Sequence, residues 1–122
     1  MKPERAAASN VDGGSVQAVV DLGHLDQYTL GDRSLQAELL QLFRAQLKDQ
    51  TEALIACSEA AAWKSAVHTL KGAARSIGAG QVGEVAEAME QVQFSDEAGR
   101  AAGLSRLIAV RAAFEAEIEE YL

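Results

Sequence analysis

The chain contains a single proline, Pro3, so no later residue removes a backbone donor or blocks the continuation of a helix. Alanine and leucine are abundant whereas β-branched and aromatic residues are few, a composition that favours helices over strands. With 122 residues, of which 48% are hydrophobic, the chain is large enough to bury one core. The sequence therefore predicts one all-α domain.

Apolar residues recur at steps of three or four in five segments, which are the expected helices. The segments run from Asp21 to Thr29, Asp32 to Ala56, Ser58 to Gly78, Gly80 to Gln93, and Ser95 to about Tyr121. Short connections between the four long segments favour antiparallel neighbours. We therefore expect an antiparallel up-down-up-down four-helix bundle with a short extra N-terminal helix, formed by residues 17–122.

The ends of these segments carry residues typical of helix caps. Asp21, Asp32, Ser58 and Ser95 are the predicted N-caps, and Gly78 is predicted to end the third helix in the left-handed conformation. Residues 1–16 are small and polar and have no apolar periodicity, so they are expected to form a disordered or loosely attached tail.

The third segment has an apolar stripe that does not include its histidine. The stripe consists of Trp63, Val67, Leu70, Ala74 and Ile77. His68 lies on the neighbouring face, with Lys64 and Gly72 one turn before and after it, and with Lys71 and Arg75 three and seven residues beyond. This helix should therefore present to solvent an imidazole flanked by positive charge.

This arrangement suits phosphoryl chemistry. Neighbouring positive charge favours the neutral imidazole, which is a nucleophile, and Lys64, Lys71 and Arg75 are candidates for contacts with phosphoryl oxygens. Gly72 costs about 0.5–1 kcal/mol relative to alanine in a helix interior and therefore needs a reason. The reason is either room for the backbone of another protein or close packing against a neighbouring helix.

The run His68-Thr69-Leu70-Lys71-Gly72, followed by Ala73, Ala74, Ile77 and Gly78, resembles the signature of histidine-containing phosphotransfer (HPt) domains. The resemblance extends from about Asp21 to Leu122, because Asp21-Leu22 and Gly31-Asp32 match two further elements of the family pattern. It implies that His68 is the phosphoacceptor. It also implies that Glu90, at the position of a family glutamine or glutamate, hydrogen-bonds Nδ1 of the imidazole.

The resemblance further implies a phosphorelay carrier and not an enzyme. His68 would shuttle a phosphoryl group between aspartates of receiver domains, those of response regulators and of a hybrid histidine kinase. The carrier would need no cofactor, since the Mg²⁺ would belong to the receivers. The sequence has no glycine-rich loop of the G-x-x-x-x-G-K-[ST] type, which argues against autophosphorylation from ATP.

Several alternatives remain open at this stage. The chain could be an HPt-like substrate phosphorylated directly by a separate kinase module, as in chemotaxis-type kinases, a reading that Glu90 in place of glutamine favours. It could also be a scaffold or inhibitor bundle that docks on a kinase without carrying phosphate. Lys64, Arg75 and Glu90 could each be solvated surface charges. The second histidine, His24, is expected to be a surface or cap residue.

Composition excludes other classes of function. A formal charge of −7 argues against nucleic acid or an anionic membrane as the main partner. One cysteine, Cys57, and two histidines provide neither an intrachain disulfide nor a usual structural zinc site, so no metal is expected. No apolar run approaches the length of a transmembrane helix. We expect a cytoplasmic monomer.

Overall fold

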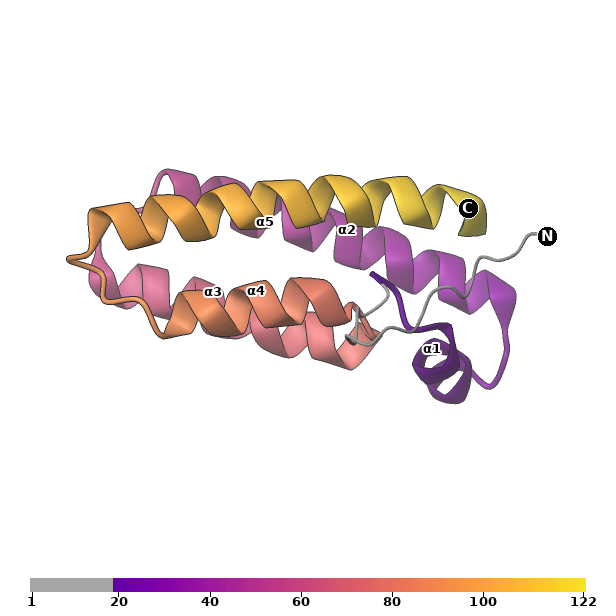
Figure 1. Ribbon diagram of the computed structural model, residues 1–122. Coiled ribbons are helices and arrows are strands. Elements are labelled where there is room, and N and C mark those ends of the chain that lie inside the picture. The colour runs from indigo at the N-terminus through magenta and orange to yellow at the C-terminus, as the bar shows by residue number, and fades with distance from the viewer. Residues whose placement is uncertain (1–18) are drawn as a thin grey trace, which may run out of the picture.

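The computed structural model describes residues 19–122, which form five α-helices, a short 3₁₀ helix and no strand (Figure 1). The helices are α1 (Leu22–Thr29), α2 (Arg33–Ile55), α3 (Ala60–Ile77), α4 (Gly80–Glu90), α5 (Glu97–Ile118) and η2 (Glu119–Tyr121). The predicted all-α fold is therefore confirmed for this part of the chain. The tail predicted for residues 1–16 lies outside the described residues.

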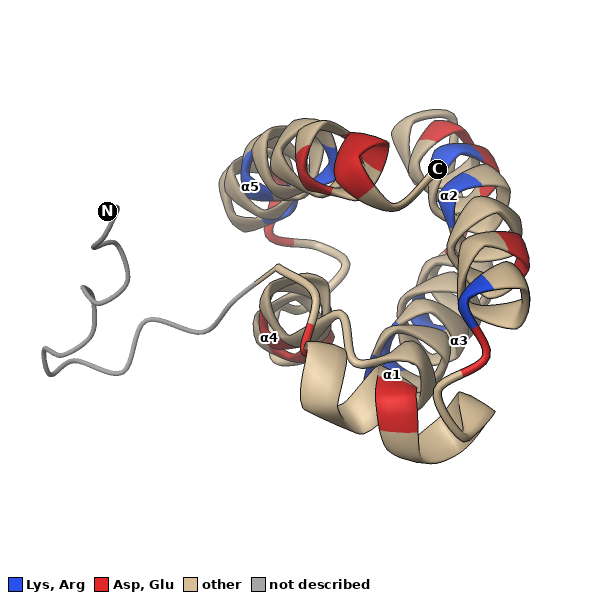
Figure 2. Ribbon diagram, turned by 90° about the vertical axis from the view of Figure 1, so that its right-hand side faces the viewer, with Lys and Arg blue, Asp and Glu red and all other residues tan. Residues whose placement is uncertain are grey.

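Helices α2 to α5 form an antiparallel bundle around a common axis, and α1 lies across one end of it (Figures 1 and 2). Each long helix packs against its neighbours in sequence, and α5 closes the ring by packing against α2. This is the predicted up-down-up-down arrangement. Within residues 19–122, no helix is both long and apolar enough to cross a bilayer.

The predicted apolar stripe of α3 is buried in the core. All five of its members are at most 8% exposed: Trp63, Val67, Leu70, Ala74 and Ile77. Across the bundle, the rings of Phe43 and Phe114 meet edge to face, with centroids 5.2 Å apart. Burial of each large apolar side chain contributes roughly 1.5–3 kcal/mol, so the stripe fixes the rotation of α3 about its axis.

Three of the predicted caps are confirmed. The carboxylate of Asp21 accepts a hydrogen bond from the backbone N–H of His24, and that of Asp32 accepts one from Leu35. Gly78 ends α3 with φ of 82°, a left-handed conformation that favours glycine.

Two predicted caps are wrong, because Ser58 and Ser95 each lie one residue too early. The N-cap of α5 is Asp96, whose carboxylate accepts from the N–H of Gly99 at 2.9 Å. A carboxylate also interacts favourably with the positive end of the helix dipole, which a hydroxyl does not. The N-cap of α3 is Glu59, which makes no side-chain capping bond.

Helix α4 ends at Glu90, three residues before the predicted end at Gln93. The chain turns there, and the ring of Phe94 packs against that of Trp63, with centroids 6.2 Å apart. This contact buries aromatic surface against α3. As a result, Glu90 lies in the last turn of α4, beside the middle of α3.

Hydrogen bonds connect the start of helix α1 to the C-terminal end of α3. The N–H of Asp21 donates to the carbonyl of Gly78, and Nε2 of His24 donates to the carbonyl of Ser76, both at 2.8 Å. These bonds satisfy carbonyls that the end of a helix leaves without partners. This agrees with the expectation that His24 is a surface or cap residue.

Candidate functional site

His68 lies in the middle of α3, one residue after the buried Val67, and its side chain is 74% exposed. The rotation of α3 that buries its apolar stripe turns this neighbouring face to solvent. The imidazole is therefore open to a reagent or a partner protein.

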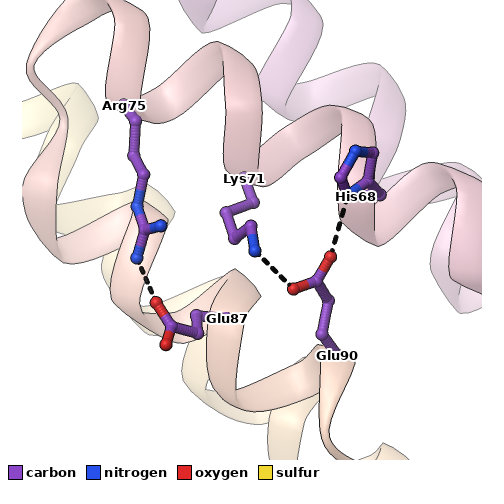
Figure 3. A network of polar contacts seen from close by, with 5 residues as sticks. All are labelled: His68, Lys71, Arg75, Glu87 and Glu90. Carbon is purple, nitrogen blue, oxygen red and sulfur yellow. Dashed lines mark hydrogen bonds and ion pairs between the residues drawn. The ribbon is translucent and has the colours of Figure 1, made fainter.

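Glu90 of α4 contacts the imidazole of His68 across the helix boundary (Figure 3). Its Oε2 lies 3.0 Å from Nδ1, which is the contact that the resemblance implied. Hydrogen bonds from Lys71 and from His68 hold the pKa of Glu90 below its ordinary value. An ionised carboxylate only accepts hydrogen bonds, so Nδ1 carries the proton and the lone pair is left on Nε2.

Lys71 holds the other oxygen of the same carboxylate. Its Nζ lies 2.6 Å from Oε1 of Glu90, and the two side chains are only 22% and 18% exposed. This half-buried ion pair keeps Glu90 in place and neutralises its charge. The carboxylate can therefore orient the ring of His68 without leaving an uncompensated negative charge beside it.

Arg75, one of the candidates for a phosphoryl contact, is paired with a residue other than His68 or Glu90. Its guanidinium donates to the carboxylate of Glu87 on α4 (Figure 3). The stem of Arg75 passes over Gly83, where an added Cβ would lie 3.2 Å from Cγ. Since seven residues of helix rise about 10 Å, Arg75 is not brought to the imidazole.

Lys64 and Gly72 flank His68 on the exposed face of α3. Both residues are exposed, and Lys64 forms no ion pair with any residue that the structure describes. A Cβ added at Gly72 would meet no atom within 4 Å. The glycine therefore does not serve packing against a neighbouring helix, and that alternative is wrong.

A cleft of about 270 Å³ adjoins the site on the side of the α3 N-terminus. Trp63, Val67 and Phe94 form apolar walls, and Lys64 and Glu90 belong to both the cleft and the site. Sequence reasoning missed this cleft because it depends on the early end of α4. In the sequence, the apolar residues Val92 and Phe94, which lie just beyond the end of α4, could have indicated this cleft.

The arrangement joins a nucleophile to the group that orients it. The imidazole is mostly exposed and its lone pair lies on Nε2, while Nδ1 contacts a carboxylate that is itself paired with a lysine. Among residues 19–122, no three His, Cys, Asp or Glu side chains are grouped so that they could hold a metal ion. The chemistry that these residues offer by themselves is nucleophilic attack by the imidazole.

Comparison with protein families agrees with this geometry. Residues 37–122 match the family model described as Hpt domain, and they include every residue of the site. No curated protein and no solved structure matched the chain in the corresponding searches. The family match covers well over half of the chain, so this protein belongs to the Hpt domain family.

Proposed function

We propose that this protein is a phosphorelay carrier that moves a phosphoryl group between receiver-domain aspartates through Nε2 of His68. The observation that carries the proposal is the exposed imidazole, 74% open to solvent, whose Nδ1 lies 3.0 Å from an ionised carboxylate. Exposure lets a whole domain approach the ring, and the fixed tautomer directs the nucleophilic lone pair outward.

In the proposed step, the Nε2 lone pair attacks the phosphorus of an aspartyl phosphate. The N–P bond forms as the bond from phosphorus to the aspartate oxygen breaks, and the aspartate leaves as a carboxylate. The proton on Nδ1 stays in its hydrogen bond with Glu90, which stabilises the positive charge that develops on the ring. Transfer to a second aspartate is the same step in reverse.

The partners in this proposal are receiver domains of response regulators and of a hybrid histidine kinase. Mg²⁺ would act at the receiver aspartate, and the carrier would contribute no cofactor. The open surface around Gly72 supports this view, since an added side chain there would project into the space that a docked domain must occupy.

Transfer from a receiver tests the proposal. A receiver domain carrying a radiolabelled aspartyl phosphate is incubated with the wild-type protein, with His68→Gln, and with His24→Gln as the matched control. The wild type and His24→Gln should acquire label that is labile in acid and stable in base. Label on His68→Gln, or none on the wild type with any receiver, would overturn the proposal.

One second candidate has an observation in its favour. Glu90 is a carboxylate where a glutamine also occurs in the family, and this favours a substrate domain phosphorylated directly by a kinase module. The two candidates differ in the donor: kinase and ATP without a receiver should label His68 in the second case. A scaffold that never carries phosphate would bind its partner equally well as wild type and as His68→Gln.

A further inference from the structure

We propose that the three cations on α3 have different roles, and that Lys64 is the one that binds the phosphoryl group on His68. Lys71 is then a positioning residue that acts through Glu90. This inference rests on the proposed function, because it concerns the phosphorylated state of the same histidine.

The carboxylates of α4 already hold two of these cations. Lys71 pairs with Glu90 and Arg75 pairs with Glu87, and each pair is neutral as a unit. Lys64 has no carboxylate partner among residues 19–122. It is therefore the source of uncompensated positive charge beside the imidazole.

Lys71 is poorly placed to change partners. Its ion pair with Glu90 is half-buried, and breaking it would leave a carboxylate with less than a fifth of its surface in water. Separating the two partners costs free energy because each charge loses its compensation and the carboxylate is only partly open to water. The same movement would also free Glu90, which holds the proton on Nδ1 of His68.

Lys64 breaks no contact when it turns toward the phosphoryl group. It lies one helical turn from His68, about 6 Å along the axis, within reach of a lysine side chain. Glu90 binds Nδ1, so the phosphoryl group would grow from Nε2, on the side of the ring away from the carboxylate. The flexible, exposed ammonium of Lys64 can meet it there.

The ionisation of the phosphoryl group itself provides the test. Phosphoramidate phosphorylates exposed imidazoles without a receiver, so the phosphohistidine can be prepared even if transfer between domains fails. ³¹P NMR then gives the midpoint of the phosphoryl titration. The charged groups around it are Lys64, Lys71 and Arg75 on α3 and Glu87 and Glu90 on α4.

In Lys64→Gln, loss of an ammonium that binds the phosphoryl oxygens, at a charge separation of about 4 Å, should raise this midpoint by about 0.7 pH unit. Lys64→Arg should restore the wild-type value. Lys48→Gln is the matched control, since it removes an exposed lysine of α2 that pairs with Glu52, and its midpoint should stay that of the wild type.

The double variant Lys71→Gln/Glu90→Gln separates the two lysines. It removes one charge of each sign, so the midpoint should move less than in Lys64→Gln. If Lys71 were the phosphoryl ligand, the double variant would move it more. The proposal is overturned if Lys64→Gln shifts the midpoint no further than the double variant does.

Discussion

Oε2 of Glu90 on α4 lies 3.0 Å from Nδ1 of His68 on α3, although 22 positions separate the two residues in the sequence. The contact determines which nitrogen carries the proton, and it holds the plane of an otherwise exposed ring. An exposed imidazole is thus oriented by a neighbouring helix and not by an enclosing pocket.

Replacing Glu90 by alanine should slow acceptance of the phosphoryl group by about 10-fold or more, because the ring then samples both tautomers and several orientations. Glu90→Gln should retain more activity, since its carbonyl oxygen can still accept from Nδ1. The measurement is the initial rate of label transfer from a phosphorylated receiver. Transfer to Glu90→Ala at the wild-type rate would remove the orienting role.

The Glu90 contacts should also make stability depend on pH. Hydrogen bonds from Lys71 and His68 keep the pKa of Glu90 below its ordinary value of 4.5. A carboxyl group whose pKa is lower in the folded state adds stability above its unfolded pKa, and this stability is lost as the pH falls through the folded pKa. The advantage of the wild type over Glu90→Gln should therefore decrease as the pH falls below about 4.5.

Urea unfolding of both proteins over this range measures that difference. Other carboxyl groups titrate equally in the two proteins and cancel. A difference in unfolding free energy that stays constant well below pH 4.5 would show that the contact with Lys71 and His68 contributes no stability.

Alanine substitutions at two helical glycines should change the free energy of unfolding in opposite directions. Gly72→Ala should raise the free energy of unfolding by about 0.5–1 kcal/mol, because the new methyl group meets no atom within 4 Å. Gly103→Ala places Cβ 2.8 Å from Cγ of Met89 in the core and should lower the free energy of unfolding by about 1–3 kcal/mol. Denaturant unfolding measures both changes. Changes of the same sign would contradict the open surroundings of Gly72 and the close packing at Gly103.

A larger side chain at Gly72 should impair transfer without harming the fold. Gly72→Leu projects into the space that a docked receiver needs, so label transfer from the receiver should slow. Phosphorylation of the same variant by phosphoramidate, a small molecule, should stay near the wild-type rate and serves as the control. Unimpaired transfer from the receiver would refute the docking explanation for this glycine.

Arg75 should matter little to the chemistry. Its ion pair with Glu87 is about half exposed, so Arg75→Gln should change the unfolding free energy by less than about 1 kcal/mol. The rate of phosphoryl acceptance should remain close to that of the wild type, because the guanidinium lies two turns from His68. A loss as large as that of Glu90→Ala would show that Arg75 reaches the transferred group.

Much of this site could be predicted because it lies on one helix. The spacing of Trp63, Val67 and Leu70 defines the buried side of α3, and the same helical geometry places His68 on the exposed side. The helix ends at Asp21, Asp32 and Gly78 were predictable for a similar reason, since each depends on hydrogen bonds within a few residues.

The contacts between α3 and α4 could not be obtained in this way. The sequence by itself determined the all-helical bundle, the exposed histidine and the positive charge around it, because local periodicity governs each of them. Only the tertiary structure decided that Lys71 pairs with Glu90, that Arg75 pairs with Glu87, and that Lys64 remains without a carboxylate partner among the described residues. Those pairings depend on where α4 ends and how it packs against α3, which long-range packing such as that of Phe94 on Trp63 determines.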